Sequence, residues 1–269
     1  MIRVAVLGIG GRMGARIAAA VRAEPDLRIA AATERPDSPH VGRDAGIVAG
    51  IGEASVPVSG SIEEALSRGV DVAIDFTAAA AAVKNAQACA RAKVALVIGT
   101  TGFSAEQKAA LAGCAKQIAL LVAPNMSVGV NVLFRLVEQA ARALGPAYEV
   151  EIVEMHHRAK KDAPSGTALK LAEAAARGLD LDLARVGVYE RHGETGERRA
   201  GEIGIQALRG GDVVGDHTVH FLADGERLEL THRATSRDNF ARGAIRAAKF
   251  VATKAAGLYD LQDVLGGHR

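Results

Sequence analysis

The chain has 269 residues, which is long enough to bury a sizeable core and favours two modest domains. Its 33 basic and 31 acidic residues leave a net charge of +2, too small for a nucleic-acid-binding protein that depends on bulk positive charge. Aromatic residues make up 3% of the chain, so base-stacking platforms are also scarce and we expect no nucleic-acid partner.

The start of the chain passes directly into an apolar, strand-like pattern, and no stretch reaches about 18 consecutive apolar residues. We therefore expect no signal peptide, no membrane partner and a cytoplasmic location. Two cysteines, Cys89 and Cys114, are too few for a disulfide framework or a thiolate metal site. Both are expected to be buried, reduced thiols.

Apolar, strand-like runs alternate with helical patterns through the first half of the chain. These runs lie at residues 2–7, 27–33, 70–76, 94–98 and 118–123. Such alternation predicts an α/β fold with a Rossmann-like, doubly wound parallel sheet, whose carboxyl edge carries the ligand-binding loops. Ser61 and Ser104, each followed three residues later by Glu or Gln, predict helix starts between the strands.

The second half of the chain has a different pattern and predicts an α+β domain with an open antiparallel or mixed sheet. Its expected elements are a helix at 127–144, a strand at 148–156, a helix at 166–177, and strands at 202–209, 213–222 and 227–234 with glycine-containing hairpin turns between them.

A last helical pattern, at 238–256, has no sheet of its own and is expected to pack on the first domain. The substrate-binding and oligomerisation domain would then be an insertion at 128–237. Residues 1–127 and 238–269 would together form a dinucleotide-binding domain.

The first predicted strand ends in a glycine-rich turn, Gly8-Ile9-Gly10-Gly11-Arg12-Met13-Gly14, and a helix follows at once. Glycine lets the backbone approach a pyrophosphate, and a helix N-terminus offers N–H groups and a positive dipole. Because Met13 occupies the third glycine position of G-x-G-x-x-G, the turn fits G-x-x-G-x-x-G instead. A tight βα turn also needs glycine for structural reasons, so the glycines alone leave the function open.

The end of the second predicted strand strengthens the case for a nucleotide. Glu34 lies 20 residues beyond Gly14, where a carboxylate accepts hydrogen bonds from the adenosine ribose and favours NAD. Its neighbour Arg35 can pair with a 2′-phosphate, as NADP requires. We therefore predict a site for NADH, NADPH or both, with a solvated surface ion pair as the alternative for these two residues.

Two further strand ends fall on the same predicted edge of the sheet. Each loop could contact the nicotinamide half of the nucleotide, and each could equally be an ordinary turn. The loops contain Gly99, Thr100 and Thr101 after one strand, and Ala123, Pro124, Asn125 and Met126 after the next.

A basic segment joins the strand at 148–156 to the helix at 166–177. Five cationic or potentially cationic side chains lie within residues 156–161, and Ser165 is a natural N-cap for a helix that starts at Gly166 and Thr167. This combination predicts a site for a small dianionic substrate, next to histidines that exchange protons near neutral pH. A solvated basic loop is the alternative. Adjacent histidines on a strand face opposite sides, so His156 and His157 do not predict a metal site.

Taken together, these motifs resemble those of the dihydrodipicolinate reductase family, which acts in the diaminopimelate route to lysine. The resemblance covers essentially the whole chain. Its carriers are G-x-x-G-R-M-G at 8–14, I-D-F-T at 74–77, G-T-T-G-F at 99–103, P-N-M-S-V-G at 124–129, H-H-R-x-K at 156–160 and D-A-P-S-G-T at 162–167.

The resemblance implies reduction of 4-hydroxy-tetrahydrodipicolinate to tetrahydrodipicolinate with NADH or NADPH and loss of water, by a homotetramer. By that analogy His156 is the acid/base residue and Lys160 the proton donor. The substrate would be held by His157, Lys160, Gly166 and Thr167, together with Ser165, which also caps the helix. The nucleotide would be held by residues 8–13, Glu34, Arg35, residues 99–101 and residues 123–126.

Two other functions are compatible with a dinucleotide site. One is an aspartate-family dehydrogenase that acts on a semialdehyde, which the H-H-x-x-K segment does not support. The other is a redox sensor that binds NAD(H) and regulates a partner. A sensor needs a docking or DNA-binding module, and no segment of the sequence predicts one.

Overall fold

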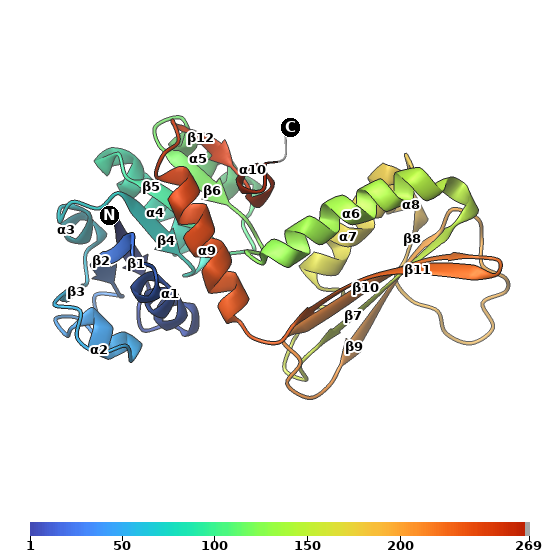
Figure 1. Cartoon of the computed structure of the whole chain (residues 1–269), viewed down its shortest axis with the longest axis horizontal. Helices are drawn as coiled ribbons and strands as arrows, with labels where there is room; N and C mark the ends of the chain where they lie inside the picture. Colours follow the sequence, from blue (N-terminus) through green and yellow to red (C-terminus); the bar gives the residue numbers. More distant parts are fainter. Residues whose placement is uncertain (267–269) are drawn as a thin grey trace. The chain divides into compact units, whose positions relative to one another are not determined.

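The computed structural model describes residues 1–266 and divides into two compact units, described separately below (Figure 1). The first unit consists of Met1–Val128 and the segment that begins at Arg237, and the second is Gly129–Ser236. Within residues 1–266, no helix is both long enough and apolar enough to cross a lipid bilayer.

The first unit is built on a seven-stranded sheet with strand order β12-β6-β5-β4-β1-β2-β3, in which neighbouring strands are parallel. The strands are β1 (Ile2–Leu7), β2 (Leu27–Thr33), β3 (Val58–Ser59), β4 (Val72–Asp75), β5 (Ala95–Ile98), β6 (Ala119–Val122) and β12 (Gly257–Tyr259). The helices are α1 (Arg12–Ala23), α2 (Ala45–Ala49), α3 (Ile62–Leu66), α4 (Ala79–Ala92), α5 (Ala105–Ala115), α9 (Asp238–Val251) and α10 (Leu261–Val264).

Alternate residues of β1 point to opposite faces of this sheet and enter two separate hydrophobic clusters. Val4 and Val6 pack in one cluster with residues of α1 and α9. Ala5 and Leu7 pack in the other with residues of α4 and α5. Burial on both faces explains why residues 4–7 of β1 are an unbroken apolar run. The predicted α/β fold, with a doubly wound parallel sheet, is confirmed.

The C-terminal helical pattern packs on the first unit as expected, but the predicted end of the helix is wrong. Helix α9 stops at Val251 instead of residue 256, and the last N–H groups form tight turns from Thr253 to Phe250 and from Lys254 to Val251. The chain then adds β12 in parallel to the edge of β6. A three-residue strand carries too little periodicity to be predicted from sequence.

The second unit contains a five-stranded mixed sheet with strand order β11-β10-β7-β9-β8. Its strands are β7 (Glu149–His156), β8 (Gly187–Val188), β9 (Ile203–Arg209), β10 (Gly215–Ala223) and β11 (Glu226–Ala234). Its helices are α6 (Val128–Leu144), the single 3-10 turn η1 (Gly145–Ala147), α7 (Gly166–Gly178) and α8 (Leu183–Val186).

The central strand of the second unit, β7, pairs in parallel with β9 and antiparallel with β10. Its alternate residues Val150 and Ile152 enter a third hydrophobic cluster with residues of α6 and α7. The expected α+β arrangement with a mixed sheet is therefore confirmed. The register of β7 also decides which polar side chains meet at its end, near His156.

The glycine turn after β1 packs directly on the first turn of α1. A Cβ atom at Gly14 would lie 2.1 Å from the carbonyl oxygen of Gly8 and 2.7 Å from that of Ile9. Because both neighbours are backbone atoms, the turn has to move if residue 14 is larger than glycine. By contrast, a Cβ at Gly113, on the exposed side of α5, meets nothing within 4 Å.

The same substitution at these two glycines should therefore change stability in opposite directions. Gly14→Ala should lower the free energy of unfolding by about 1–3 kcal/mol through overpacking. Gly113→Ala should raise it by about 0.5–1 kcal/mol, because alanine loses less backbone entropy in a helix. Urea unfolding of both variants measures the difference, and a Gly14→Ala protein as stable as the parent would contradict the close packing described here.

Candidate active site

The glycine turn forms an open cradle at the carboxyl end of β1. Gly8 has a φ angle of 75°, a conformation that suits glycine, and the N–H groups of Gly8 and Ile9 donate to the carbonyl of Thr33 at the end of β2. The N-cap of α1 is Gly11, which brings no side chain over the helix end. A bare turn at the N-terminus of a 12-residue helix fits a pyrophosphate, so the residues present suit a dinucleotide.

Glu34 lies beside this cradle and already binds it. Its Oε1 accepts the N–H of Gly10 at 2.8 Å, and the ring of His40 lies against the same glycine. The neighbouring guanidinium of Arg35 is 79% exposed and lies 3.9 Å from the carboxylate of Asp37. Glu34 and Arg35 therefore both lie at the end of β2, with Glu34 bound to the glycine turn and Arg35 extended into solvent.

A buried acidic residue at the end of β4, Asp75, holds the loop that follows β4 and contacts the loop after β5. Its carboxylate accepts the N–H and hydroxyl of Thr77 at 2.8 and 2.7 Å, and the side-chain amide of Asn85 at 2.7 Å. Thr100, which also contacts Asp75, is buried, as is Met126.

The basic segment leaves β7 at His156 and forms a loop that is tied to the connection between β9 and β10. The hairpin expected at this connection is wrong, because β9 and β10 pair with opposite edges of β7 instead of with each other. The N–H of His157 donates to the carbonyl of Val213 at 2.8 Å, and that of Lys160 to the carbonyl of His157 at 3.1 Å. The ammonium of Lys160 binds both carboxylate oxygens of Asp162 at 2.8 Å. This pairing lowers the pKa of the Asp162 carboxyl, so the lysine keeps an ionised partner.

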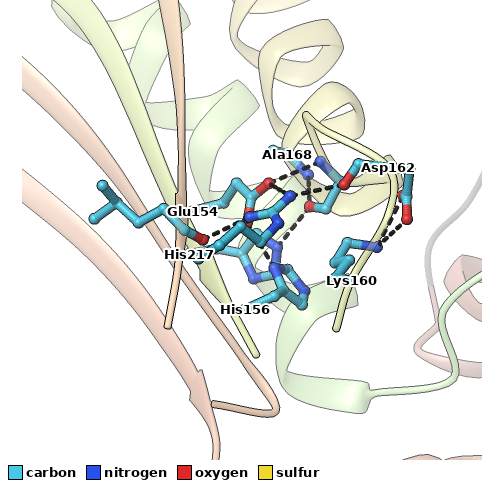
Figure 2. A network of polar contacts seen from close by, with 9 residues as sticks. Glu154, His156, Lys160, Asp162, Ala168 and His217 are labelled. Carbon is cyan, nitrogen blue, oxygen red and sulfur yellow. Dashed lines mark hydrogen bonds and ion pairs between the residues drawn. The ribbon is translucent and has the colours of Figure 1, made fainter. Parts of the chain in front are cut away.

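Behind the loop, Ser165 starts α7 as predicted. Its hydroxyl accepts the N–H of Ala168 at 3.1 Å and lies 3.0 Å from Nε2 of His217. Figure 2 shows His156, Lys160, Asp162 and His217 gathered around this helix start. The predicted substrate residues of the second unit are thus brought together by one loop, one strand end and one helix.

At the centre of the network lies Glu154, whose side chain has no exposed surface. One oxygen, Oε1, accepts the N–H of Ser165 at 3.0 Å, and the other, Oε2, lies 2.6 Å from Nδ1 of His156. Arg209 reaches both oxygens at 2.8 Å. Burial alone would raise the pKa of Glu154, but the hydrogen bonds from His156 and Arg209 outweigh it and lower the pKa from 4.5 to about 2.

His217 completes the buried side of the network as a neutral ring. Burial lowers its pKa from 6.5 to about 3, and the nearby His156 adds to the effect. The two imidazoles meet edge to face, with ring centroids 5.2 Å apart. His217 therefore packs beside His156 without adding a positive charge at neutral pH.

Sequence reasoning did not assign roles to Glu154, Asp162, Arg209 or His217. One clue was present for Glu154, because residues two apart on a strand share a face and Glu154 stands two residues before His156. Arg209 and His217 come from other strands, where the register sets Arg209 opposite His156 and His217 opposite Glu154. No local pattern predicts that register.

Comparisons with known proteins agree with the geometry of both units. The family model described as dihydrodipicolinate reductase, N-terminus, matches residues 2–126, and the corresponding C-terminus model matches residues 129–265. A 4-hydroxy-tetrahydrodipicolinate reductase from Anaeromyxobacter sp. is 57% identical over 266 residues, covering 99% of this chain and 98% of the relative. One from Myxococcus xanthus is 53% identical over 270 residues, covering 100% and 99%.

Among solved structures, the chain is similar to a dipicolinate-bound dihydrodipicolinate reductase from Paenisporosarcina sp. TG-14. The two share 26% sequence identity with a TM-score of 0.76, over 97% of each chain. The predicted family, the predicted class of oxidoreductase and its pyridine-nucleotide dependence are thereby confirmed. With both family models matched and relatives above half identity over its whole length, the chain belongs to the dihydrodipicolinate reductase family.

Proposed function

We propose that the chain reduces 4-hydroxy-tetrahydrodipicolinate to tetrahydrodipicolinate, with loss of water, through His156 and Lys160 of the second unit. The observation that carries the assignment of residues is the arrangement of a histidine, a lysine and a helix start around one loop. The similarity to reductases of this name, one of them bound to dipicolinate, supports the substrate class.

The substrate is a ring with two carboxylates, and the loop has the groups that such a dianion needs. The start of the 13-residue helix α7 presents the N–H groups of its first turn, at Gly166 and Thr167, to an anion. A Cβ at Gly166 would meet nothing within 4 Å, so the approach to this helix end is open. Lys160 and His157 supply positive charge or hydrogen bonds beside it.

The protons of the reaction are assigned to two side chains. Loss of the hydroxyl group as water gives the ring a conjugated C=C–C=N system; a bound reduced nicotinamide would supply the hydride that reduces it, and the ring would then carry negative charge. The ammonium of Lys160 stabilises that charge and donates the proton that quenches the enamine. His156 moves the proton needed for loss of the hydroxyl group as water, because an imidazole gains and loses protons near neutral pH.

For the nucleotide, we propose that the glycine turn holds the pyrophosphate, and that both NADH and NADPH are accepted. The loops at residues 99–101 and 123–126 would contribute backbone contacts to the nicotinamide half. Glu34 suits the ribose hydroxyls of NADH, while the exposed Arg35 suits the 2′-phosphate of NADPH.

We also propose a homotetramer assembled through the second unit, which analytical ultracentrifugation of the full chain tests directly.

Lys160→Ala should lower kcat by about 100- to 1000-fold, the usual cost of losing one preorganised charge donor in an active site. The assay follows loss of reduced-nucleotide absorbance with substrate generated by a synthase from pyruvate and aspartate semialdehyde. Lys161→Ala is the matched control, because it removes the exposed neighbouring lysine and should leave kcat within about threefold. Equal activity of the two variants would remove Lys160 from the proposed mechanism.

Arg35→Ala should raise KM for NADPH by about fivefold and change KM for NADH little, since a surface charge pair with a phosphate contributes on the order of 1 kcal/mol. Glu34→Gln should raise KM for NADH more than KM for NADPH, because the amide weakens the bonds to the ribose hydroxyls. Steady-state kinetics with each nucleotide measure both effects. If neither variant separates the two nucleotides, the proposed discrimination at the end of β2 is wrong.

A further inference from the structure

The carboxylate of Glu154 is surrounded by donors from three different elements. They are the N–H of Ser165 at the start of α7, two nitrogens of Arg209 at the end of β9, and Nδ1 of His156 on its own strand. The side chain is fully buried within this shell. The low pKa of Glu154, about 2, keeps the carboxylate ionised through the pH range in which enzymes of this kind act.

An ionised carboxylate accepts hydrogen bonds and donates none. A backbone N–H and a guanidinium can only donate, so three of the four contacts allow one assignment of hydrogens. The fourth, 2.6 Å from Nδ1 of His156, therefore requires the hydrogen to be on Nδ1. When the ring is neutral, the lone pair is then on Nε2.

The residue beside that second nitrogen is a glycine. Gly215, the first residue of β10, lies beside Nε2 of His156, and a Cβ atom there would be 3.0 Å from it. The His156 ring itself is 12% exposed, and His217 packs edge-on against it. Nδ1 of the ring is thus bound to the buried Glu154 carboxylate, whereas any residue larger than glycine at position 215 would crowd Nε2.

We propose that Glu154 is a positioning residue that holds His156 in the Nδ1–H tautomer, so that Nε2 is the nitrogen that exchanges protons with the substrate. Because the same carboxylate also holds the N–H of Ser165, it keeps the acid/base group and the anion-binding start of α7 at a constant separation. Arg209 offsets the buried charge and, through the carbonyl of Asp162 at 2.7 Å, ties the basic loop to the same point. This inference rests on the proposed role of His156.

Glu154→Gln provides a sharp test, because every partner of the carboxylate is a donor. The NH₂ group of glutamine replaces one oxygen and so faces one Arg209 nitrogen together with either Nδ1 of His156 or the N–H of Ser165. Of the four donors only Nδ1 of His156 can become an acceptor, by moving its hydrogen to Nε2. We expect ring ¹⁵N spectra of neutral His156 to change from the Nδ1–H to the Nε2–H pattern. We expect kcat to fall by about 100-fold, at the lower end of the range for general acid–base catalysis, and KM to change by less than about threefold.

The matched control is Glu151→Gln, on the same strand three residues earlier. Glu151 also binds arginine through both oxygens, Arg191 at 2.8 Å, but it makes no contact with His156. This control should leave the His156 tautomer unchanged and kcat within about twofold. If Glu154→Gln keeps the Nδ1–H pattern, or if its kcat equals that of the control, Glu154 has only a structural role.

If the Glu154→Gln variant does not fold, the proposal can still be tested on the unaltered protein. In ¹⁵N spectra of the full chain, neutral His156 should show a protonated Nδ1 and an unprotonated Nε2, and the opposite pattern overturns the proposal. This measurement needs no turnover. An inactive protein with the expected tautomer would count against the proposed function, whereas an active protein with the opposite tautomer would count against the role of Glu154.

Discussion

The substrate side of this protein depends on a single buried negative charge. An isolated carboxylate inside a protein costs several kcal/mol, and it is tolerated where donors surround it. Glu154 meets this condition because a strand end, a helix start and a neighbouring strand each direct a donor at it. The charge therefore links β7, β9 and the start of α7, which are not all adjacent in the sequence. The geometry of the basic loop depends on how these three elements are placed around Glu154.

The nucleotide side is organised in a similar way, around Asp75. This carboxylate, also without exposed surface, stands at the end of β4 and holds Thr77, Asn85 and Thr100. In both units a buried acidic residue near the end of a strand arranges the loops that follow. Loops placed in this way can offer backbone groups to a ligand while their own side chains remain packed.

Two cationic side chains of the proposed substrate site, Arg209 and Lys160, have different partners, and the difference suits different tasks. Arg209 is permanently charged and its planar fork matches the buried carboxylate of Glu154, so it serves as a fixed counter-charge. Lys160 pairs with Asp162, whose side chain is 66% exposed. An exposed partner is held weakly in water, so the ammonium can exchange it for a substrate carboxylate at little cost.

The sequence by itself determined the alternation of strands and helices in the first unit, the glycine turn with Glu34, and the basic segment followed by Ser165, the N-cap of α7. These are local features, set by hydrophobic periodicity, turn chemistry and helix capping within a few residues of one another. It also carried the motifs that identify the family. The end of α9 and the strand β12 escaped prediction, because three residues of edge strand have no distinctive pattern.

Only the tertiary structure decided which distant side chains support the proposed catalytic pair. Arg209 and His217 reach Glu154 through the pairing of β7 with β9 and β10, and strand register is set by burial across the whole sheet. A shift of one residue would have turned His217 to the opposite face. The protonation pattern of His156 depends on those contacts, so no spacing in the sequence could predict it.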